Sequence, residues 1–353
     1  MTTSLTSNNS ERLKWLQVGR FLAAFWVLLH HGEGQLFNGA FGIGVSWKTY
    51  GLLGVDFFFC LSGFIIIFQC WSSFGNPESA GRFLQRRIVR IYPLIWLVML
   101  AQILASITIG NTSTPTDWAT LTCDALLLPA KQEHTINVAW SLRHEMFFYG
   151  ITAVIMLFKP KSALCLTCAW FIGILLTSFW KTHDSNLIGK FLFSSWNILF
   201  LTGVFVAFAF QNVHKKAANW LAVGFLLFIC GLLFLISGSY PSHHTPEDLP
   251  RMISSAIMFG GVLTFLIGLD LKGIQPPWIL VLLGDASYSI YIVHSTVLYH
   301  LRAHLNGFGL QIASIIAIPI ILGISVLTYR YFERPSAQFF RKLFFETRPT
   351  SGS

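Results

Sequence analysis

Charge is what this 353-residue chain has least of, because only 11% of its residues are Asp, Glu, Lys or Arg. A soluble domain carries about 25% charged residues, and a chain with 54% hydrophobic residues has too few polar groups to cover a water-exposed surface. The 33 Phe and 12 Trp residues exclude a disordered chain, which is poor in aromatics. Since about 20 apolar residues cross a bilayer, the composition predicts an all-α, polytopic integral membrane protein without a large soluble domain.

The chain also lacks features that point to other protein classes. Its six cysteines lie mostly in apolar runs, and Cys165 and Cys168 have no nearby His or Cys partner in the sequence, so we expect no metal site. The first apolar run contains Arg20 and no small-residue cleavage site, which argues against a removable signal peptide. The net charge of +9 is not gathered on an exposed domain, so we expect no nucleic-acid partner.

Apolar runs that are separated by charged residues or by Pro, Gly and Asn predict ten transmembrane helices. Their expected ranges are 15–32, 50–70, 89–109, 138–158, 162–180, 188–210, 218–236, 252–271, 278–300 and 309–332. Residues 1–14 and 336–353 are then short cytoplasmic segments on either side of a transmembrane domain over 15–335. Membrane lipids are the first expected partners of such a chain.

The basic residues support this count and predict that both termini are cytoplasmic. With that orientation the inside loops hold sixteen Lys and Arg residues, whereas the outside loops hold six. Positive charge accumulates on the cytoplasmic side of membrane proteins. The six expected outside residues are Lys48, Lys131, Lys181, Lys190, Arg251 and Arg302.

Arg20 and His31 are ionisable residues inside the first predicted span, where they mark function by default. They lie 11 positions apart, which is about three helical turns and roughly 16 Å along one face. In the fourth span, which contains Trp140, the residues Ser141, Glu145 and Tyr149 share one face of the helix. We expect Glu145 to lie at a depth in the membrane similar to that of His31. A His–Glu pair raises the basicity of the imidazole and fixes its tautomer. The alternative is that these charges only anchor helix ends at the interface.

A cluster of arginines precedes the third predicted span. Arg82, Arg86 and Arg90 are spaced four residues apart, so they form one edge of a helix, and Arg87 lies beside them. Guanidinium groups bind phosphate oxygens in a bidentate manner. This edge therefore predicts a site for a phosphorylated cytoplasmic donor, and the alternative is plain positive-inside anchoring or contact with lipid headgroups.

Two further polar positions lie within predicted spans. Asp56 enters the second span among aromatics, where an unpaired carboxylate would be neutral or bonded, and Ser62 follows it in a Ser/Gly packing notch. In the ninth span, Asp285 and His294 face opposite sides of the helix, so at most one of them lines a shared pocket. His294 has the better depth, and we expect it to make a structural hydrogen bond.

Together these motifs resemble the acyltransferase 3 family of bacterial integral membrane acyltransferases, closest in style to the stand-alone exopolysaccharide O-acetyltransferases. The resemblance covers about residues 12–335. Each motif is weak alone, but four in this order are specific: Arg20-x10-His31, Gly54-Val55-Asp56-x-Phe58-Phe59-x-Leu61-Ser62-Gly63-Phe64, Arg86-x3-Arg90-Ile91-x-Pro93 and Trp140-Ser141-Leu142-x2-Glu145-x2-Phe148-Tyr149. One departure is the stretch Leu16-Gln17-Val18-Gly19, which lacks the acidic residue that some members have before the arginine.

The resemblance implies transfer of an acyl group, usually acetyl, from cytoplasmic acyl-CoA to a carbohydrate hydroxyl at the outer side of the bacterial cytoplasmic membrane. It implies that His31 is the main catalytic residue, with Arg20 as its companion and Glu145 at the reaction centre. Arg86 and Arg90, joined by Arg87, would contact the CoA phosphates. The residues expected to contact substrate or support the site are Asp56, Ser62, Trp140, Ser141, Tyr149 and His294.

The acceptor would be a cell-surface or exported polysaccharide, either free or lipid-linked, and polysaccharide assembly machinery would be a partner. Acyl-CoA would serve as a co-substrate, with no metal required. Direct transfer and a transient acyl-histidine are both compatible with the motifs. The rival function is a transporter or flippase for a lipid-linked saccharide, although the sequence shows neither the inverted repeats nor the paired broken helices of such proteins. A purely structural subunit of a polysaccharide assembly complex is a third reading.

Overall fold

The computed structural model describes residues 13–32, 51–109, 117–130, 135–180, 187–213, 216–237, 249–305 and 310–345. Over these ranges the chain forms helices and no strand, which confirms the all-α prediction. The elements in chain order are α1 (Lys14–Gly32), α3 (Leu53–Cys70), η2 (Trp71–Ser73), α4 (Pro77–Ile109), α5 (Trp118–Ala125), α6 (Ala139–Ile155), α7 (Pro160–Trp180), α8 (Leu187–Leu192), α9 (Asn197–Asn212), α10 (Ala217–Ser237), α11 (Leu249–Leu271), α12 (Trp278–Asp285), α13 (Ser287–Leu305), α14 (Leu310–Thr328), the π-helical turn η3 (Tyr329–Glu333) and α15 (Arg334–Phe345).

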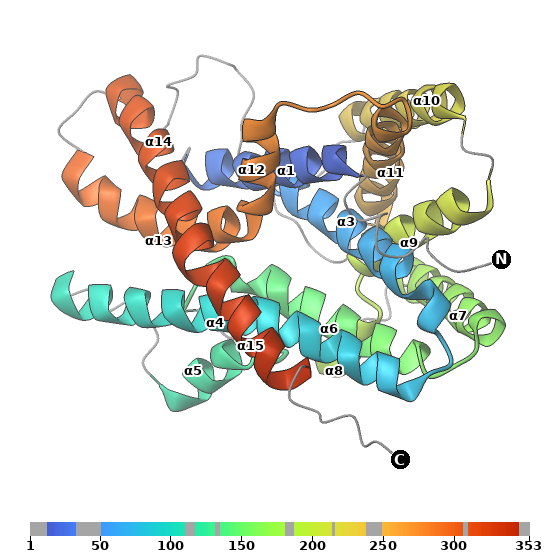
Figure 1. Cartoon of the computed structure of the whole chain (residues 1–353), viewed down its shortest axis with the longest axis horizontal. Helices are drawn as coiled ribbons and strands as arrows, with labels where there is room; N and C mark the ends of the chain where they lie inside the picture. The colour runs from blue at the N-terminus through green and yellow to red at the C-terminus, as the bar shows by residue number, and fades with distance from the viewer. Residues whose placement is uncertain are drawn as a thin grey trace.

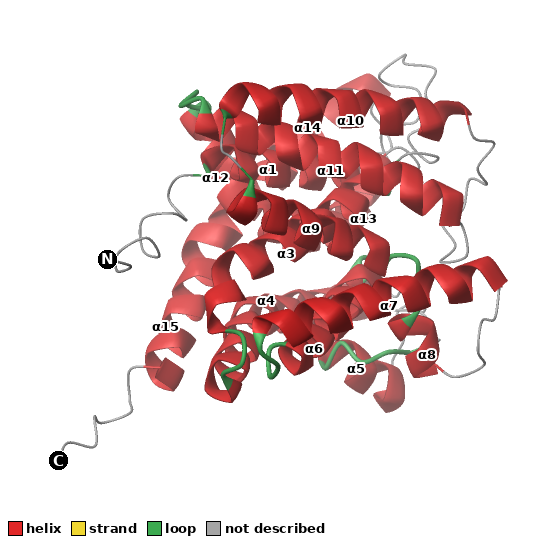
Figure 2. Cartoon of the chain, turned by 90° about the vertical axis from the view of Figure 1, so that its right-hand side faces the viewer, coloured by secondary structure: helices red, strands yellow, loops and turns green. Residues whose placement is uncertain are grey.

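The helices lie in two groups. Helices α4, α5, α6 and α8 occupy the lower half of both overall views, whereas α1, α10, α11, α12 and α14 occupy the upper half (Figures 1 and 2). Helix α1 packs against α3, α11, α12 and α13, and α3 also packs against α6, α9 and α11. Because α1 and α3 contact so many neighbours, Arg20 of α1 and Asp56 and Ser62 of α3 lie among protein side chains.

Six helical segments in the described ranges are long and apolar enough to cross a membrane, and the bent pair α12–α13, which turns by 68°, could make a seventh. These segments are Leu53–Ser73, Pro77–Ile107, Pro160–Trp180, Ala217–Ser237, Leu249–Leu271 and Ile315–Phe344. Helices α6 and α9 have 17 and 16 residues, and α1 is too polar because it carries Arg20 and two histidines. A multi-pass membrane protein is therefore supported, while ten spans and cytoplasmic termini stay predictions.

Several helices begin or divide at residues other than those predicted from the sequence. Helix α4 begins at Pro77 rather than near residue 89, because proline suits the first position of a helix. The side-chain oxygen of Asn76 also accepts hydrogen bonds from the backbone N–H groups of Glu78 and Ser79, at 3.0 and 3.3 Å. The predicted segment 188–210 divides into α8 and α9, and the segment 278–300 divides into α12 and α13.

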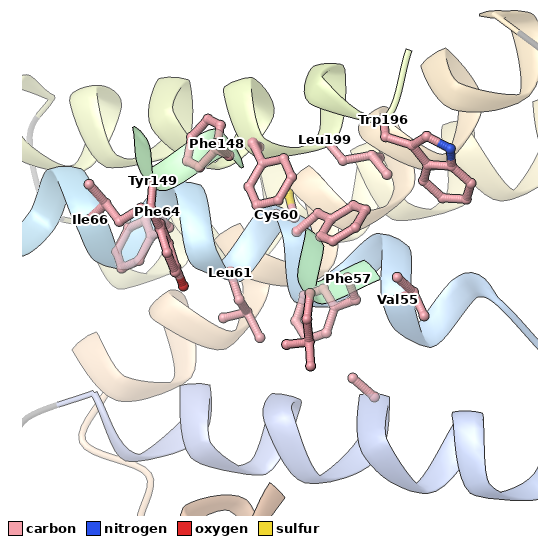
Figure 3. Close-up of a cluster of buried hydrophobic side chains, with 14 of the residues drawn as sticks. Val55, Phe57, Cys60, Leu61, Phe64, Ile66, Phe148, Tyr149, Trp196 and Leu199 are labelled. Carbon is pink, nitrogen blue, oxygen red and sulfur yellow. The ribbon is translucent and has the colours of Figure 1, made fainter. Parts of the chain in front are cut away.

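Glycines allow α3 to approach its neighbours closely. A Cβ atom added at Gly63 would lie 1.9 Å from the Phe200 carbonyl oxygen, and one added at Gly203 would lie 1.8 Å from the Cys60 carbonyl oxygen. The backbones of α3 and α9 are therefore in direct contact, which is how small residues stabilise helix pairs in membranes. Figure 3 shows the buried side chains of α3 between α9 on one side and α1 on the other.

Stacked aromatic rings join α6 to this pair. The ring of Phe200 on α9 lies 4.1 Å from that of Phe148 on α6 and 4.4 Å from that of Phe59 on α3, measured between centroids. These contacts fix the face of α6 that carries Ser141, Glu145 and Tyr149 against α3.

Candidate active site

The arginines of α4 line an open hollow at the start of that helix. We call it the arginine vestibule; its volume is about 380 Å³, and its wall includes Gln69, Cys70, Ser79, Arg82, Arg86, Arg87 and Arg90. Arg82 forms an ion pair of 2.9 Å with Glu78, four residues earlier. The structure thus places the predicted basic edge on one helix, with its guanidinium groups around one hollow.

A second, smaller cavity lies between α1, α3, α4, α6 and α13. We call it the inner cavity; it encloses about 80 Å³. Its polar wall consists of Arg20, Ser62, Arg87, Arg90, Ser141, Glu145, Tyr149, Tyr288 and Tyr291. Arg87 and Arg90 line both the vestibule and the inner cavity, so the two hollows meet at these side chains.

Glu145 is held in the inner cavity by two hydroxyl groups. Ser62 Oγ donates a hydrogen bond of 2.6 Å to Glu145 Oε1, and the Tyr149 hydroxyl donates to the same oxygen. The guanidinium of Arg87 lies 5.2 Å from the centre of the Tyr149 ring, a cation–π contact. Residues expected from three separate motifs therefore form one connected group.

Arg20 projects into the same cavity from α1. Its Nη1 donates a hydrogen bond of 2.9 Å to Gln17 Oε1, three residues earlier on the same helix. Arg90, Glu333 and Asp285 are the charges that act most strongly on this guanidinium. Arg20 and Arg90 are thus two close positive charges whose mutual repulsion requires anionic neighbours.

Glu333 is one such neighbour, and the sequence reasoning missed it. It lies in the π-helical turn η3, it is buried, and it accepts a hydrogen bond of 2.5 Å from Ser289 Oγ. Its carboxylate also interacts electrostatically with Arg90 and Arg20. The one available signal was a Glu directly before Arg334 and Pro335 at the end of a long apolar run.

His31 lies beside His294 of α13, with 5.2 Å between the ring centroids, and beside His30 at 4.9 Å. Among the described residues it neither lines the inner cavity nor contacts Glu145. Tyr291 links the two places, because it lines the cavity and its ring lies 6.1 Å from that of His294.

The match in depth between His31 and Glu145 stays a prediction, and the contacts that connect their surroundings run through α6 and α13. Ser141 Oγ and the Tyr291 hydroxyl are hydrogen-bonded at 2.6 Å, and Glu145 lies one helical turn from Ser141. His294 lies about one turn from Tyr291 on α13. Helix α6 begins inside the protein, since Val138 and Ala139 are only 0% and 3% exposed.

Asp56 does not line the inner cavity. Its Oδ2 accepts a hydrogen bond of 3.0 Å from Arg251 Nη2, and both side chains are buried. Arg251 was expected in an outside loop; this is wrong, because the residue lies in the first turn of α11, where it neutralises the carboxylate. Trp140 also lies outside the cavity wall and packs on Trp196 at 5.3 Å.

The start of α6 is held by a second buried ion pair, between Arg143 and Asp124 of α5. Asp124 also accepts a hydrogen bond of 2.6 Å from the Thr135 backbone N–H. The side chain of Arg143 is buried and anchors α6 to α5.

Chemically, this site combines an anion-binding vestibule with a small polar cavity. Guanidinium groups at the junction suit phosphate or a developing oxyanion, and the carboxylate and imidazoles suit proton transfer. In the part of the chain that the structure describes, no three His, Cys, Asp or Glu residues are grouped as metal ligands.

Comparison with known proteins agrees with this arrangement. The family model Acyl_transf_3, described as an acyltransferase domain, matches residues 13–330. The chain is 26% identical over 302 residues to the exopolysaccharide production protein ExoZ of Rhizobium meliloti (strain 1021), an alignment that covers 81% of this chain and 90% of that protein.

It is also 24% identical over 331 residues to the acyltransferase MdmB of Streptomyces mycarofaciens, covering 84% of this chain and 81% of that protein. No solved structure matches the chain. The family match spans all the helices that build the inner cavity, so the chain belongs to the acyltransferase 3 family and is a membrane acyltransferase.

Proposed function

We propose that this protein transfers an acyl group, in the first instance acetyl, from cytoplasmic acyl-CoA to a hydroxyl of a cell-surface or exported polysaccharide. It would do so in the bacterial cytoplasmic membrane, with the acceptor on the outer side and either free or lipid-linked. The similarity to a protein named for exopolysaccharide production supports a polysaccharide acceptor and contact with polysaccharide assembly machinery.

The observation that carries the proposal is the junction at Arg87 and Arg90. Acyl-CoA is a polyanion with an uncharged arm about 15–20 Å long that ends in the thioester, a length similar to the rise from Arg20 to His31. Phosphates bound in the vestibule by Arg86 and its neighbours would direct this arm past Arg87 and Arg90 into the inner cavity. The cavity has room for a short acyl group and not for the nucleotide.

In the reaction, the acceptor oxygen attacks the thioester carbonyl, the new C–O bond forms and the C–S bond breaks. His31 takes the proton of the hydroxyl and returns it to the departing thiolate, so that CoA leaves as the thiol. Arg20 stabilises the negative charge that develops on the carbonyl oxygen, and Glu145 with its hydroxyl partners orders the cavity wall around the thioester. A transient acyl-histidine that is then attacked by the sugar gives the same balance.

The donor site is tested with purified full-length protein in lipid nanodiscs. Release of free CoA thiol from acetyl-CoA is measured against acetyl-CoA concentration. Replacing Arg86 and Arg90 by Gln should raise the KM for acetyl-CoA by roughly tenfold or more, because each lost charged hydrogen bond is worth about 1.5–3 kcal/mol. Lys161→Gln removes an exposed charge that does not line the vestibule and should leave KM unchanged.

The acceptor side is tested by mass spectrometry of the host surface polysaccharide. Cells with the wild-type protein should show an acyl increment that is absent from cells without it and from cells with His31→Ala inserted normally in the membrane. A polysaccharide of equal mass in all three would contradict the proposed function, as would acyl transfer by the His31→Ala variant.

A further inference from the structure

A second histidine faces His31 from across the helix interface. His294 on α13 is completely buried, with 0% of its surface exposed. The centroids of the two imidazole rings are 5.2 Å apart and their planes make an angle of 40°. A fully desolvated imidazole next to the expected catalytic residue requires an explanation.

One nitrogen of His294 has a defined partner. Its Nδ1 lies 3.0 Å from the carbonyl oxygen of Ile290, one turn earlier on α13. A carbonyl oxygen can only accept, so Nδ1 must carry the hydrogen and donate it. In the neutral ring this leaves Nε2 as the unprotonated nitrogen, with a lone pair that can accept a hydrogen bond.

The other nitrogen has no partner among the residues that the structure describes. Nε2 of His294 is buried and makes no hydrogen bond in the described parts of the chain. A buried acceptor without a donor costs about 1–3 kcal/mol. The hydrogen bond from Nδ1 to the backbone therefore fixes the tautomer in which Nε2 carries the lone pair. Nε2 is then a buried hydrogen-bond acceptor that needs a donor.

His31 is at the right distance to supply that donor. A hydrogen bond of about 2.9 Å between two ring nitrogens, each slightly more than 1 Å from its ring centre, separates the centroids by roughly 5.2 Å. This equals the separation between His31 and His294. If the His31 side chain rotates about its own single bonds, an N–H of its ring can reach His294 Nε2 while both helices stay in place.

We propose that His294 is the positioning residue of His31, a role expected of Glu145 from the sequence. His294 Nε2 accepts the N–H of His31, which fixes the tautomer of His31 and turns its other nitrogen, with its lone pair, toward the acceptor hydroxyl. The carbonyl of Ile290 in turn orients His294. This inference rests on the proposed function, in which His31 is the base.

The same arrangement connects His31 to the inner cavity. Tyr291, one turn before His294, lines that cavity and bonds Ser141 on α6. Its ring packs near that of His294 at 6.1 Å. Tyr291 and His294, on a single turn of α13, would thus link the cavity that receives the thioester to the histidine that acts as the base.

Kinetics of purified full-length protein in nanodiscs, with acetyl-CoA as the probe and a saturating extract of host polysaccharide as acceptor, test the proposal. His294→Leu should lower kcat by roughly tenfold or more, the scale of losses when a general base is misoriented, and leave the KM for acetyl-CoA within about twofold. His294→Gln, whose side-chain oxygen can accept from His31, should recover most of the lost rate.

His144→Leu is the matched control. His144 stacks on Phe191 at 4.4 Å and does not itself line the cavity, where its neighbour is the apolar ring of Phe59 at 6.4 Å, so its removal should leave kcat nearly unchanged. If wild-type protein is active, His31→Ala is inactive and His294→Leu keeps the wild-type kcat, the positioning role is overturned and the proposed function stands. Equal loss in His294→Leu and His294→Gln would also overturn it.

A readout that needs no turnover separates the two hypotheses further. In protein labelled with ¹⁵N-histidine, the His31 side-chain signals are those that disappear in His31→Gln. They should report a single tautomer in the wild type and a mixture of tautomers in His294→Leu. Identical His31 signals in both proteins would overturn the hydrogen bond between the rings, whatever the activity.

Discussion

Arg251 of α11 and Asp56 of α3 form an ion pair inside the protein, with 3.0 Å between Nη2 and Oδ2 and exposed side-chain fractions of 5% and 0%. The pair joins two helices that belong to the six described segments long and apolar enough to cross a membrane. Replacing only one of the two residues would leave the other as a buried charge without its counter-ion. This costs far more free energy of folding than the loss of an exposed pair.

This pair is therefore the first target for mutagenesis. Arg251→Met or Asp56→Leu alone should destabilise the protein by about 3–5 kcal/mol, whereas the double variant should recover most of that loss. The measurement is the temperature at which detergent-solubilised protein loses its monodisperse size-exclusion peak. Glu78→Gln breaks the exposed Glu78–Arg82 pair and should shift that temperature little. A double variant as unstable as the singles would contradict the prediction.

The second prediction concerns the hydrogen bonds of Glu145. Glu145→Gln keeps the shape of the side chain and removes its charge, so it should lower kcat with acetyl-CoA by roughly 100-fold without reducing the yield of folded protein. Tyr149→Phe removes one of two donors to the carboxylate and should cost less, roughly tenfold. Wild-type turnover in Glu145→Gln would show that the carboxylate has no part in the chemistry.

Two glycines offer a matched test of helix packing. Gly63→Ala places a Cβ 1.9 Å from the Phe200 carbonyl oxygen, so α3 and α9 must separate and the yield of folded protein should fall sharply. Gly150→Ala on α6 meets no atom within 4 Å and should stabilise the protein by roughly 0.5–1 kcal/mol, because alanine is the better helix former. Equal thermal stability of the two variants would argue against backbone contact between α3 and α9.

A pH-dependent element lies at the start of α5, outside the candidate spans. The backbone N–H of Thr120 donates 2.8 Å hydrogen bonds to Asp117, and this lowers the pKa of the Asp117 carboxyl below its ordinary value of 3.8. A lowered carboxyl pKa stabilises the folded state above the unfolded pKa, and the contribution is lost as the pH falls through the folded pKa.

Amide hydrogen exchange in α5 should thus rise below about pH 4 more steeply in the wild type than in Asp117→Asn. The amide of asparagine still caps the helix but does not titrate in this range. Comparing both proteins at each pH removes the intrinsic pH dependence of exchange. Parallel profiles would indicate that the cap does not depend on the carboxylate charge.

The sequence was sufficient for the helical class, the family and most of the inner cavity. Arg20, Ser62, Arg90 and Glu145 could be found because each lies in a short local motif, and a charge within an apolar run is conspicuous. The neighbour of His31 could not be found, because the packing of α13 against α1, and not the spacing along either helix, brings His294 beside it.

Partners across the fold were equally beyond reach. The sequence indicated that Asp56 needed a partner, but Arg251 is 195 positions away and seemed to belong to a loop. Glu333 reaches Ser289 through a π-helical turn, a local change of helical geometry that apolar periodicity does not predict. In both cases tertiary packing, rather than the local pattern, decides which residues meet.

Helix α4 has 33 residues and is therefore about 50 Å long, whereas the hydrocarbon layer is about 30 Å thick. Its arginines occupy the first four turns, and its apolar stretch follows them. A helix of this kind holds its charged portion in the headgroup layer, while its apolar portion lies in the hydrocarbon core of the bilayer. The nucleotide of an acyl-CoA bound there would stay in water. Only the uncharged arm that carries the thioester would have to enter the membrane interior.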